Sequence, residues 1–272
     1  MVESGQKDGI KSVQAFRSPY RHRLARAMCN RSYIVNKSSH VIGDCAMHPN
    51  PSKLCADHLR ATLYSSSKLK ASHARELAAA YFGYKSHASL LADGRYPIDC
   101  LPDASILIPD VPLLSTRVTE LKGLPGDLPT PIELAKTCSE AISGDCFGGE
   151  IWLYDSLENY LMEVLLIRDD GRIQDCLSGV MAETNAYFDD AYYDHAETSD
   201  DGDIVAVSIS GVYSGENHPD RLFCGDRIDM KIEIELYRCA GRRGFTDFDL
   251  SATGEINDDW VDPELRFGSA SG

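Results

Sequence analysis

The stretch IDMKIEIELY, residues 228–237, decides the fold, because apolar and polar side chains alternate along it. The apolar positions are Ile228, Met230, Ile232, Ile234 and Leu236. Since successive side chains of a β-strand point to opposite faces, this alternation predicts a strand with one buried and one solvent-facing side. The stretch IVAVSISGVY, residues 204–213, has the same period and predicts a second strand. A polar loop at residues 214–227 joins the two, which indicates an antiparallel pair.

Outside this pair, helical and extended patterns follow one another along the chain. Apolar residues recur at three- and four-residue spacing, which predicts helices at residues 54–64, 73–82, 87–92, 131–142, 156–165 and 173–193. Ser86 and Thr130 precede two of these segments, as N-cap residues do, and Gly83 suits the left-handed position after a helix. Short strands are predicted at residues 105–108, 150–154 and 248–256, and an acidic turn at residues 194–203.

These elements predict an α+β fold in two parts. A small N-terminal helical module, residues 54–94, precedes a larger acidic domain, residues 104–266, with a mostly antiparallel sheet and flanking helices. Residues 1–53 are basic and lack sustained apolar periodicity, so we expect them to be a disordered arm. A second interpretation is that translation begins at Met47 and that the preceding segment is not made.

Charge is distributed unevenly along the 272 residues, whose formal net charge is −15. Residues 1–100 hold 15 Lys and Arg against 7 Asp and Glu, a net of +8, which leaves −23 for residues 101–272. An acidic domain repels nucleic-acid phosphates and attracts basic protein surfaces. We therefore expect a basic protein partner for the acidic domain, and nucleic-acid contact through the N-terminal part only. An acidic surface that only favours solubility is the alternative.

The nine cysteines and the hydropathy pattern bear on the compartment. The cysteines are widely spaced and include no CxxC pair, which argues against a zinc ribbon or a secreted disulfide scaffold. No run of about 18 apolar residues is present, and the basic N-terminus is not followed by the apolar core of a secretory signal. We expect a cytoplasmic protein with reduced thiols and no membrane partner.

A helical unit with a glycine turn, HARELAAAYFGYKSHASLLAD, occupies residues 73–93. It resembles a helix-turn-helix unit with Gly83 at the turn, and this resemblance implies DNA contacts from Lys85, His87 and Ser89 on a recognition helix. The same stretch resembles the front of uncharacterised proteins of bacterial plasmids and integrative elements, which implies a mobile-element setting but names no activity. A helical hairpin without DNA contacts is the alternative.

A dense group of acidic residues precedes the first predicted long strand. The carboxylates are Asp189, Asp190, Asp194, Asp200, Asp201 and Asp203. With His195 among them, a divalent metal ion is one interpretation, but the spacing does not match a calcium-binding EF-hand loop. A solvated acidic loop that contacts a protein partner is the interpretation we favour, and we assign no metal site.

The loop between the two long predicted strands places a cysteine and a histidine close together, at Cys224 and His218. A Cys/His hydrolase needs these side chains to converge, and a hydrolase built here predicts that His195 joins them in one pocket. The alternative is that Phe223 and Cys224 anchor the loop to the sheet. A basic turn, Gly241–Gly244, is predicted to contact a phosphate, to neutralise carboxylates or to form a hairpin.

Nucleotide-binding and hydrolase motifs such as GxxxxGK[ST], GxGxxG, GxSxG and HExxH are absent from the sequence, so we assign no catalytic residue and no cofactor. We expect a non-enzymatic interaction protein of a bacterial mobile element whose acidic domain binds a basic partner, for example as an inhibitor of a host defence complex. A DNA-binding transcriptional regulator and a metal-dependent or Cys/His hydrolase are the alternatives.

Overall fold

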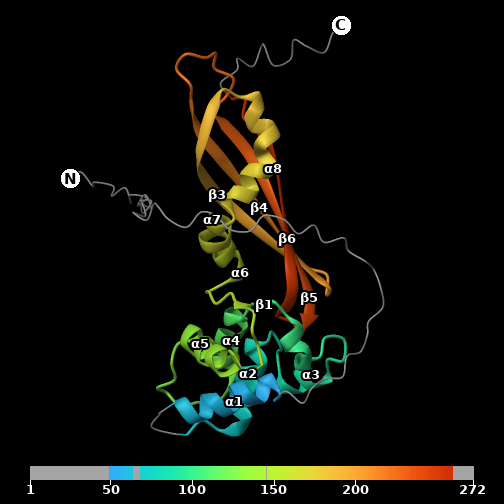
Figure 1. The fold of residues 1–272 in the computed structure, drawn as a ribbon. Coiled ribbons are helices and arrows are strands. Elements are labelled where there is room, and N and C mark those ends of the chain that lie inside the picture. The colour runs from blue at the N-terminus through green and yellow to red at the C-terminus, as the bar shows by residue number, and fades with distance from the viewer. Residues whose placement is uncertain (1–48, 64–67, 145, 260–272) are drawn as a thin grey trace, which may run out of the picture. The chain divides into compact units, whose positions relative to one another are not determined.

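The computed structural model describes residues 49–63, 68–144 and 146–259, and the predicted basic arm up to residue 48 lies outside these ranges. The chain folds as the predicted α+β protein, with a six-stranded sheet and flanking helices (Figure 1). The helices are α1 Pro51–Thr62, α2 Ala71–Tyr81, α3 His87–Ala92, η1 Ile98–Asp103, α4 Val111–Glu120, α5 Pro131–Ile142, α6 Leu157–Tyr160, η2 Leu161–Leu165, α7 Leu166–Arg168 and α8 Asp170–Glu183. The strands are β1 Ile106–Leu107, β2 Glu150–Ile151, β3 Ala186–Asp200, β4 Ile204–Asn217, β5 Arg227–Ala240 and β6 Gly244–Ile256.

The sheet has the strand order β2-β1-β6-β5-β4-β3. Strands β3 to β6 pair with their sequence neighbours in antiparallel fashion, as the alternation in residues 204–213 and 228–237 predicts. The short β1 joins the sheet antiparallel to β6 and parallel to β2. The sheet therefore consists of four long strands, and the two-residue strands β1 and β2 extend it beside β6.

The sequence analysis is wrong for the segment that becomes β3. We predicted a helix at residues 173–193 and an acidic turn at residues 194–203, whereas helix α8 ends at Glu183 and β3 takes up the end of the predicted helix and most of the predicted turn. Its pairing with β4 shifts register between Phe188 and Asp190 and again between Tyr193 and His195. These shifts interrupt the alternation of side chains and leave apolar residues at a spacing that also suits a helix.

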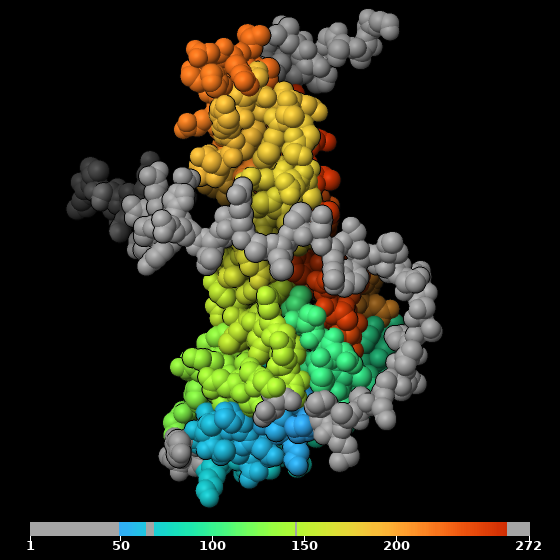
Figure 2. All heavy atoms as spheres, in the orientation of Figure 1, coloured from blue at the N-terminus to red at the C-terminus, as the bar shows by residue number. Residues whose placement is uncertain are grey.

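One face of the long strands is buried under helices α6 to α8. Every second residue of β5 from Ile228 to Leu236 points inward, and Ile173 and Leu177 of α8 pack against this side. In the space-filling view, the yellow atoms of the α6–α8 region cover the sheet (Figure 2). Burial of these aliphatic side chains, each worth about 1.5–3 kcal/mol, fixes which side of the sheet faces solvent.

A second core lies among the helices α1, α2, α4 and α5. It contains Leu59, Leu77, Tyr81, Leu114 and Leu134, all less than 1% exposed. Helix α5 begins with the predicted cap, because Thr130 at the N-cap and Glu133 at the third helical position form a capping box. Helices on both sides of residues 94–104 share this core, and the division of the chain there into two domains stays a prediction.

Helix α4 was not predicted. Pro112 lies in the first turn of this helix, where a missing N–H costs little. Asp110 caps the helix by accepting a hydrogen bond from the N–H of Leu113 at 2.9 Å. Among residues 49–63, 68–144 and 146–259, no helix combines the length and apolar character needed to cross a lipid bilayer.

Candidate functional site

The solvent-facing side of strands β3 to β6 is a candidate interaction surface, which we call the open face. The register aligns its side chains in rows across the sheet, such as Glu197, Ser208, Glu233 and Ser251. The central strand β4 contributes small side chains to these rows, at Ala206, Ser208 and Ser210. Longer acidic side chains stand on the neighbouring strands β3 and β5. Partner atoms can therefore approach β4 between the carboxylates of these two strands.

Carboxylates outnumber cations on the open face. The carboxylates are Asp190, Glu197, Glu216, Asp229, Glu233, Glu235, Asp249 and Glu255, and the cations are Arg227 and Lys231. Lys231 Nζ lies 2.6 Å from Glu233 Oε1, and this hydrogen bond raises the pKa of Lys231. Tyr237 donates its hydroxyl to Asp249 at 2.7 Å, and the pKa of Tyr237 is raised by that contact. The face is therefore strongly negative.

Two tyrosines stand on the same face. Tyr187 is 66% exposed and Tyr192 is 56% exposed, and both lie on β3. Tyr192 pairs with Val212, whose side chain also faces outward. Exposed tyrosines are enriched where proteins bind one another, because each ring offers a large contact area at low entropic cost. The open face thus combines negative charge with aromatic contact residues.

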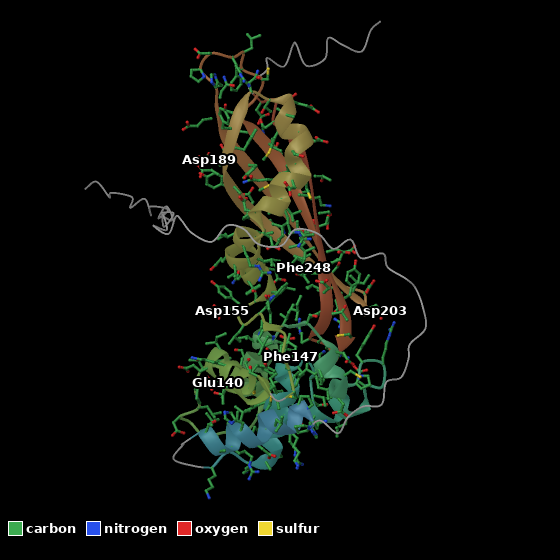
Figure 3. The ribbon with its side chains drawn as sticks, viewed as in Figure 1. Glu140, Phe147, Asp155, Asp189, Asp203 and Phe248 are labelled. Carbon is green, nitrogen blue, oxygen red and sulfur yellow. The ribbon has the colours of Figure 1, made fainter. Side chains whose placement is uncertain are left out.

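The six predicted partner-binding carboxylates separate into two groups. Asp189, Asp190 and Asp194 are exposed on β3, with Asp189 and Asp194 at the two register shifts. Asp200, Asp201 and Asp203 lie at the end of β3 and in the turn that follows it. Figure 3 shows Asp189 and Asp203 at well-separated positions. Of the six, only Asp190 has a paired position on the open face.

The second group is engaged in contacts that hold the β3–β4 turn. Both Asp200 oxygens accept from the Arg238 guanidinium, at 3.1 and 2.8 Å. Burial alone would raise the pKa of Asp200, but the Arg238 hydrogen bonds and the Gly202 N–H together lower it. Asp201 accepts from the N–H of Ile204 at 2.7 Å, which closes the turn. Asp203 accepts from Arg95 at 2.6 Å.

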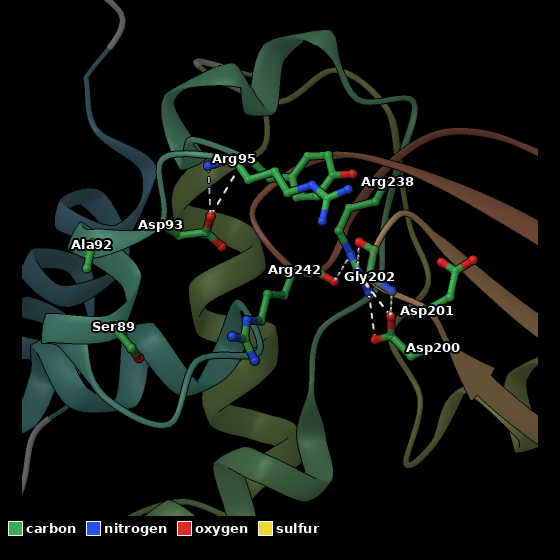
Figure 4. Close-up of a pocket in the computed structure, with 10 residues that line it drawn as sticks. Ser89, Ala92, Asp93, Arg95, Asp200, Asp201, Gly202, Arg238 and Arg242 are labelled. Carbon is green, nitrogen blue, oxygen red and sulfur yellow. Dashed lines mark hydrogen bonds and ion pairs between the residues drawn. The ribbon is translucent and has the colours of Figure 1, made fainter.

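The turn borders a pocket of about 610 Å³. Its lining includes Arg95, Arg238 and Arg242, whose side chains surround the same open space in Figure 4. The segment after α3 contributes Asp93 and Tyr96 to another wall. None of these pocket arginines was predicted, except that the Gly241–Gly244 turn was considered for phosphate contact. Arg243 of that turn forms an ion pair with Asp110, as the neutralising alternative predicts.

Asp93, in the pocket wall, makes the stability of the fold depend on pH. It accepts hydrogen bonds from the Tyr84 hydroxyl at 2.8 Å and from the N–H of Arg95 at 3.1 Å. Burial raises the pKa of Asp93, but these hydrogen bonds and that from the Tyr96 N–H outweigh burial and lower it. Because the pKa is lower in the folded state, ionised Asp93 stabilises the fold above its unfolded pKa of about 3.9, and this stabilisation is lost at lower pH.

We expect Asp93→Asn to lower the free energy of unfolding at pH 7, and expect the difference from wild type to shrink as the pH falls below about 3.9. Urea unfolding across this range measures the effect. Asp57→Asn on the exposed side of α1 is the control. A deficit for Asp93→Asn that is the same at pH 7 and in acid would contradict a role for the ionised carboxylate.

The residues predicted to contact DNA lie in and before α3. Lys85 is exposed, whereas His87 and Ser89 are half-buried. Ser89 forms a capping box with Ser86, because the N–H of each residue donates to the hydroxyl of the other, at 3.1 and 3.2 Å. The N–H of His87 donates to Glu76 at 3.3 Å. Ser89 therefore stabilises the start of a six-residue helix, and DNA contact by these residues stays a prediction.

The structure does not bring His195, His218 and Cys224 together in one pocket. His218 and Cys224 both contact Asn185, since the His218 N–H donates to Asn185 O at 3.1 Å and Asn185 Nδ2 donates to Cys224 Sγ at 3.4 Å. His195 lies nine residues along β3 from the pair Ala186–Asn217, which corresponds to about 25–30 Å. His195 therefore does not share a pocket with the other two. Asn185 Nδ2 also donates to Leu222 O at 2.8 Å, so Asn185 anchors the loop at both Leu222 and Cys224.

The described part of the chain contains no group of three or more His, Cys, Asp or Glu side chains arranged to hold a metal ion. None of the seven cysteines in this part forms a disulfide with another described cysteine. The two features that can bind another molecule are thus the open face, by charge and aromatic contact, and the arginine-lined pocket. Comparisons of the chain with protein-family models, curated proteins and solved structures find no match.

Proposed function

We propose that the protein is a non-enzymatic interaction protein whose open face binds a basic protein surface. The observation that carries this proposal is the set of eight carboxylates, against two cations, on one uncovered side of four adjacent strands. Complementary charge accelerates encounter and selects against acidic partners. The register holds these carboxylates at fixed spacing, so a partner with lysines or arginines at matching positions loses little entropy on binding.

The exposed tyrosines add to the affinity for the partner, beyond what the carboxylates contribute. Rim charges at protein interfaces change association rates more than affinity, whereas aromatic side chains are frequent among the residues that dominate the binding energy. Tyr187 and Tyr192 stand beside the carboxylates of β3 on the open face. We expect these two rings to contact apolar or cationic side chains of the partner, with the carboxylates arranged around them.

The partner and setting follow from the charge and from the resemblance of residues 73–93 to proteins of bacterial mobile elements. A basic surface that normally receives nucleic acid is the type of partner that a rigid array of carboxylates fits. Inhibition of a host defence complex in the cytoplasm is the role this combination favours. The seven described cysteines form no disulfide with one another, which is compatible with a reducing compartment.

The test compares partner capture by three versions of the tagged full chain in lysate of a bacterial host. The face variant carries Asp229→Asn, Glu233→Gln and Glu235→Gln on β5. The matched control carries Asp57→Asn, Glu140→Gln and Glu183→Gln, which remove the same charge from exposed helical positions. We expect wild type and control to retain one basic protein in stoichiometric amount, and the face variant to retain at least about tenfold less, because about 1.4 kcal/mol of binding energy is lost.

Binding through the open face is also expected to weaken as the salt concentration rises, because the contacts are between exposed charges. Equal capture of the basic protein by the face variant and the control would contradict the proposal. Recovery of DNA that is lost on Lys85→Glu would instead favour the transcriptional regulator. Circular dichroism of each version separates loss of binding from loss of folding.

A further inference from the structure

The arginine-lined pocket holds one guanidinium that makes no ion pair with a described residue. Arg95 is paired with Asp203, and Arg238 is paired with Asp200. Arg242 instead lies over the ring of Tyr84, with 5.2 Å between Cζ and the ring centroid. We propose that this pocket binds a small molecule through an oxyanion group, a phosphate or a carboxylate, held by Arg242. The site is separate from the open face and does not depend on the proposed partner.

The carboxylates of the pocket are already occupied as acceptors. Asp200 receives two hydrogen bonds from Arg238, and Asp93 receives the Tyr84 hydroxyl and two backbone N–H groups. Asp201 Oδ1 accepts from the backbone of the turn that it closes. Asp93 is held only by neutral donors and keeps its charge, and Arg242 contributes to lowering the pKa of Asp93, so this aspartate balances part of the Arg242 charge. The N–H donors of Arg242 form no hydrogen bond with a side chain of the described residues, so they remain able to donate to an oxyanion.

The backbone of Arg242 is held in place from several sides. Arg242 O accepts from Arg238 Nε at 3.1 Å, and the N–H of Gly241 donates to Tyr96 O at 2.9 Å. Gly241 has a φ of +54°, and a Cβ there would lie 2.9 Å from Ile98 Cδ1. The turn can therefore approach η1 this closely only with glycine at this position.

Arg242 also packs against the turn between α2 and α3. A Cβ on Gly83, whose φ is +84°, would lie 3.1 Å from Arg242 Cβ and 3.0 Å from Arg243 Cγ. Gly83 thus permits direct contact between the α2–α3 turn and both arginines. These contacts hold the backbone and Cβ of Arg242, and the Tyr84 ring beneath the exposed guanidinium favours one orientation of that side chain. Such preorganisation lowers the entropic cost of binding.

The chemistry of the site defines the ligand class. A guanidinium donates two parallel hydrogen bonds to a phosphate or a carboxylate, and stacking on an aromatic ring leaves its edge free to do so. The volume of about 610 Å³ is in the range of small-molecule sites. Figure 4 shows the open space bordered by Arg242, Arg238 and Arg95. A small organic phosphate or carboxylate fits this arrangement.

Calorimetric titration of the full chain tests the site, with inorganic phosphate as one probe and acetate as the other, at constant ionic strength. We expect saturable binding of at least one probe with a Kd of roughly 1 mM or below, and at least a tenfold rise of that Kd in Arg242→Gln. The arm that saturates identifies the oxyanion as phosphate or carboxylate. Absence of saturable binding in both arms would overturn the proposal.

Arg172→Gln is the matched control, because Arg172 also lies over an aromatic ring, that of Phe248 at 5.3 Å, but does not line the pocket. We expect it to bind the probes as wild type does. A second variant, Ala92→Glu, adds a carboxylate to the exposed pocket wall and keeps Arg242, and it is expected to weaken probe binding. Equal weakening by Arg172→Gln and Arg242→Gln would show nonspecific charge binding and overturn the assignment.

Discussion

Replacing Trp152 with alanine is expected to lower the free energy of unfolding by about 3–5 kcal/mol. The indole is 1% exposed, stacks on the ring of Tyr160 with centroids 4.9 Å apart, and meets Phe248 edge-on at 5.5 Å. Its Nε1–H donates to Glu150 at 3.0 Å. The substitution removes all of these contacts at the point where β2 leads into α6, so it leaves a large cavity. Chemical denaturation of wild type and variant measures the difference.

Trp152→Phe provides the control for this prediction. A phenyl ring retains most of the apolar contact with Tyr160 and Phe248 but lacks the donor to Glu150, so we expect a loss near 1–2 kcal/mol. The indole hydrogen bond is the largest influence that lowers the pKa of Glu150, followed by that from Arg168. A Trp152→Ala variant as stable as Trp152→Phe would show that the ring packing contributes little.

The strands that were predicted and the strand that was missed differ in one physical property. In β5, every second side chain is buried and apolar, so the alternation in residues 228–237 is enough to identify the strand. In β3, the register shifts at Asp189 and Asp194 break the alternation, and the inward side chains are only partly buried. Edge strands commonly carry such irregularities and charges, because these features oppose unwanted strand pairing. The sequence alone therefore suggested a helix there.

The two candidate sites also differ in how far the sequence alone could predict them. A negative domain was evident from composition, and the strand register then shows which carboxylates share a face. The pocket depends on contacts between residues far apart in the chain, such as Arg95 with Asp203 and Arg238 with Asp200. No local pattern predicts these pairs. Three of the six aspartates expected to bind a partner are instead occupied within the protein, because clustering in sequence does not indicate whether a cation lies nearby in space.

Arg238→Ala is expected to lower the free energy of unfolding by about 2–4 kcal/mol. The Arg238 side chain is only 6% exposed and bonds both oxygens of Asp200, the carbonyl of Gly202 and, at 3.1 Å, the carbonyl of Arg242. Alanine leaves all of these acceptors without their donor. Because Asp200 is 54% exposed and regains water, the loss stays below that for a fully buried pair. Urea unfolding at neutral pH measures it.

A double-mutant cycle of Arg238→Ala with Asp200→Ala separates the ion pair from the carbonyl contacts. We expect Arg238→Ala to cost more than Asp200→Ala, because the Gly202 and Arg242 carbonyls lose their donor only when the arginine is removed. We also expect the double variant to be less destabilised than the sum of the single variants, since the salt bridge is lost in each. Equal single losses would contradict a larger contribution of the two carbonyl contacts than of the Gly202 N–H bond that Asp200 also accepts. Additive losses would mean that the carbonyl contacts hold it and that the Asp200 pair is energetically silent.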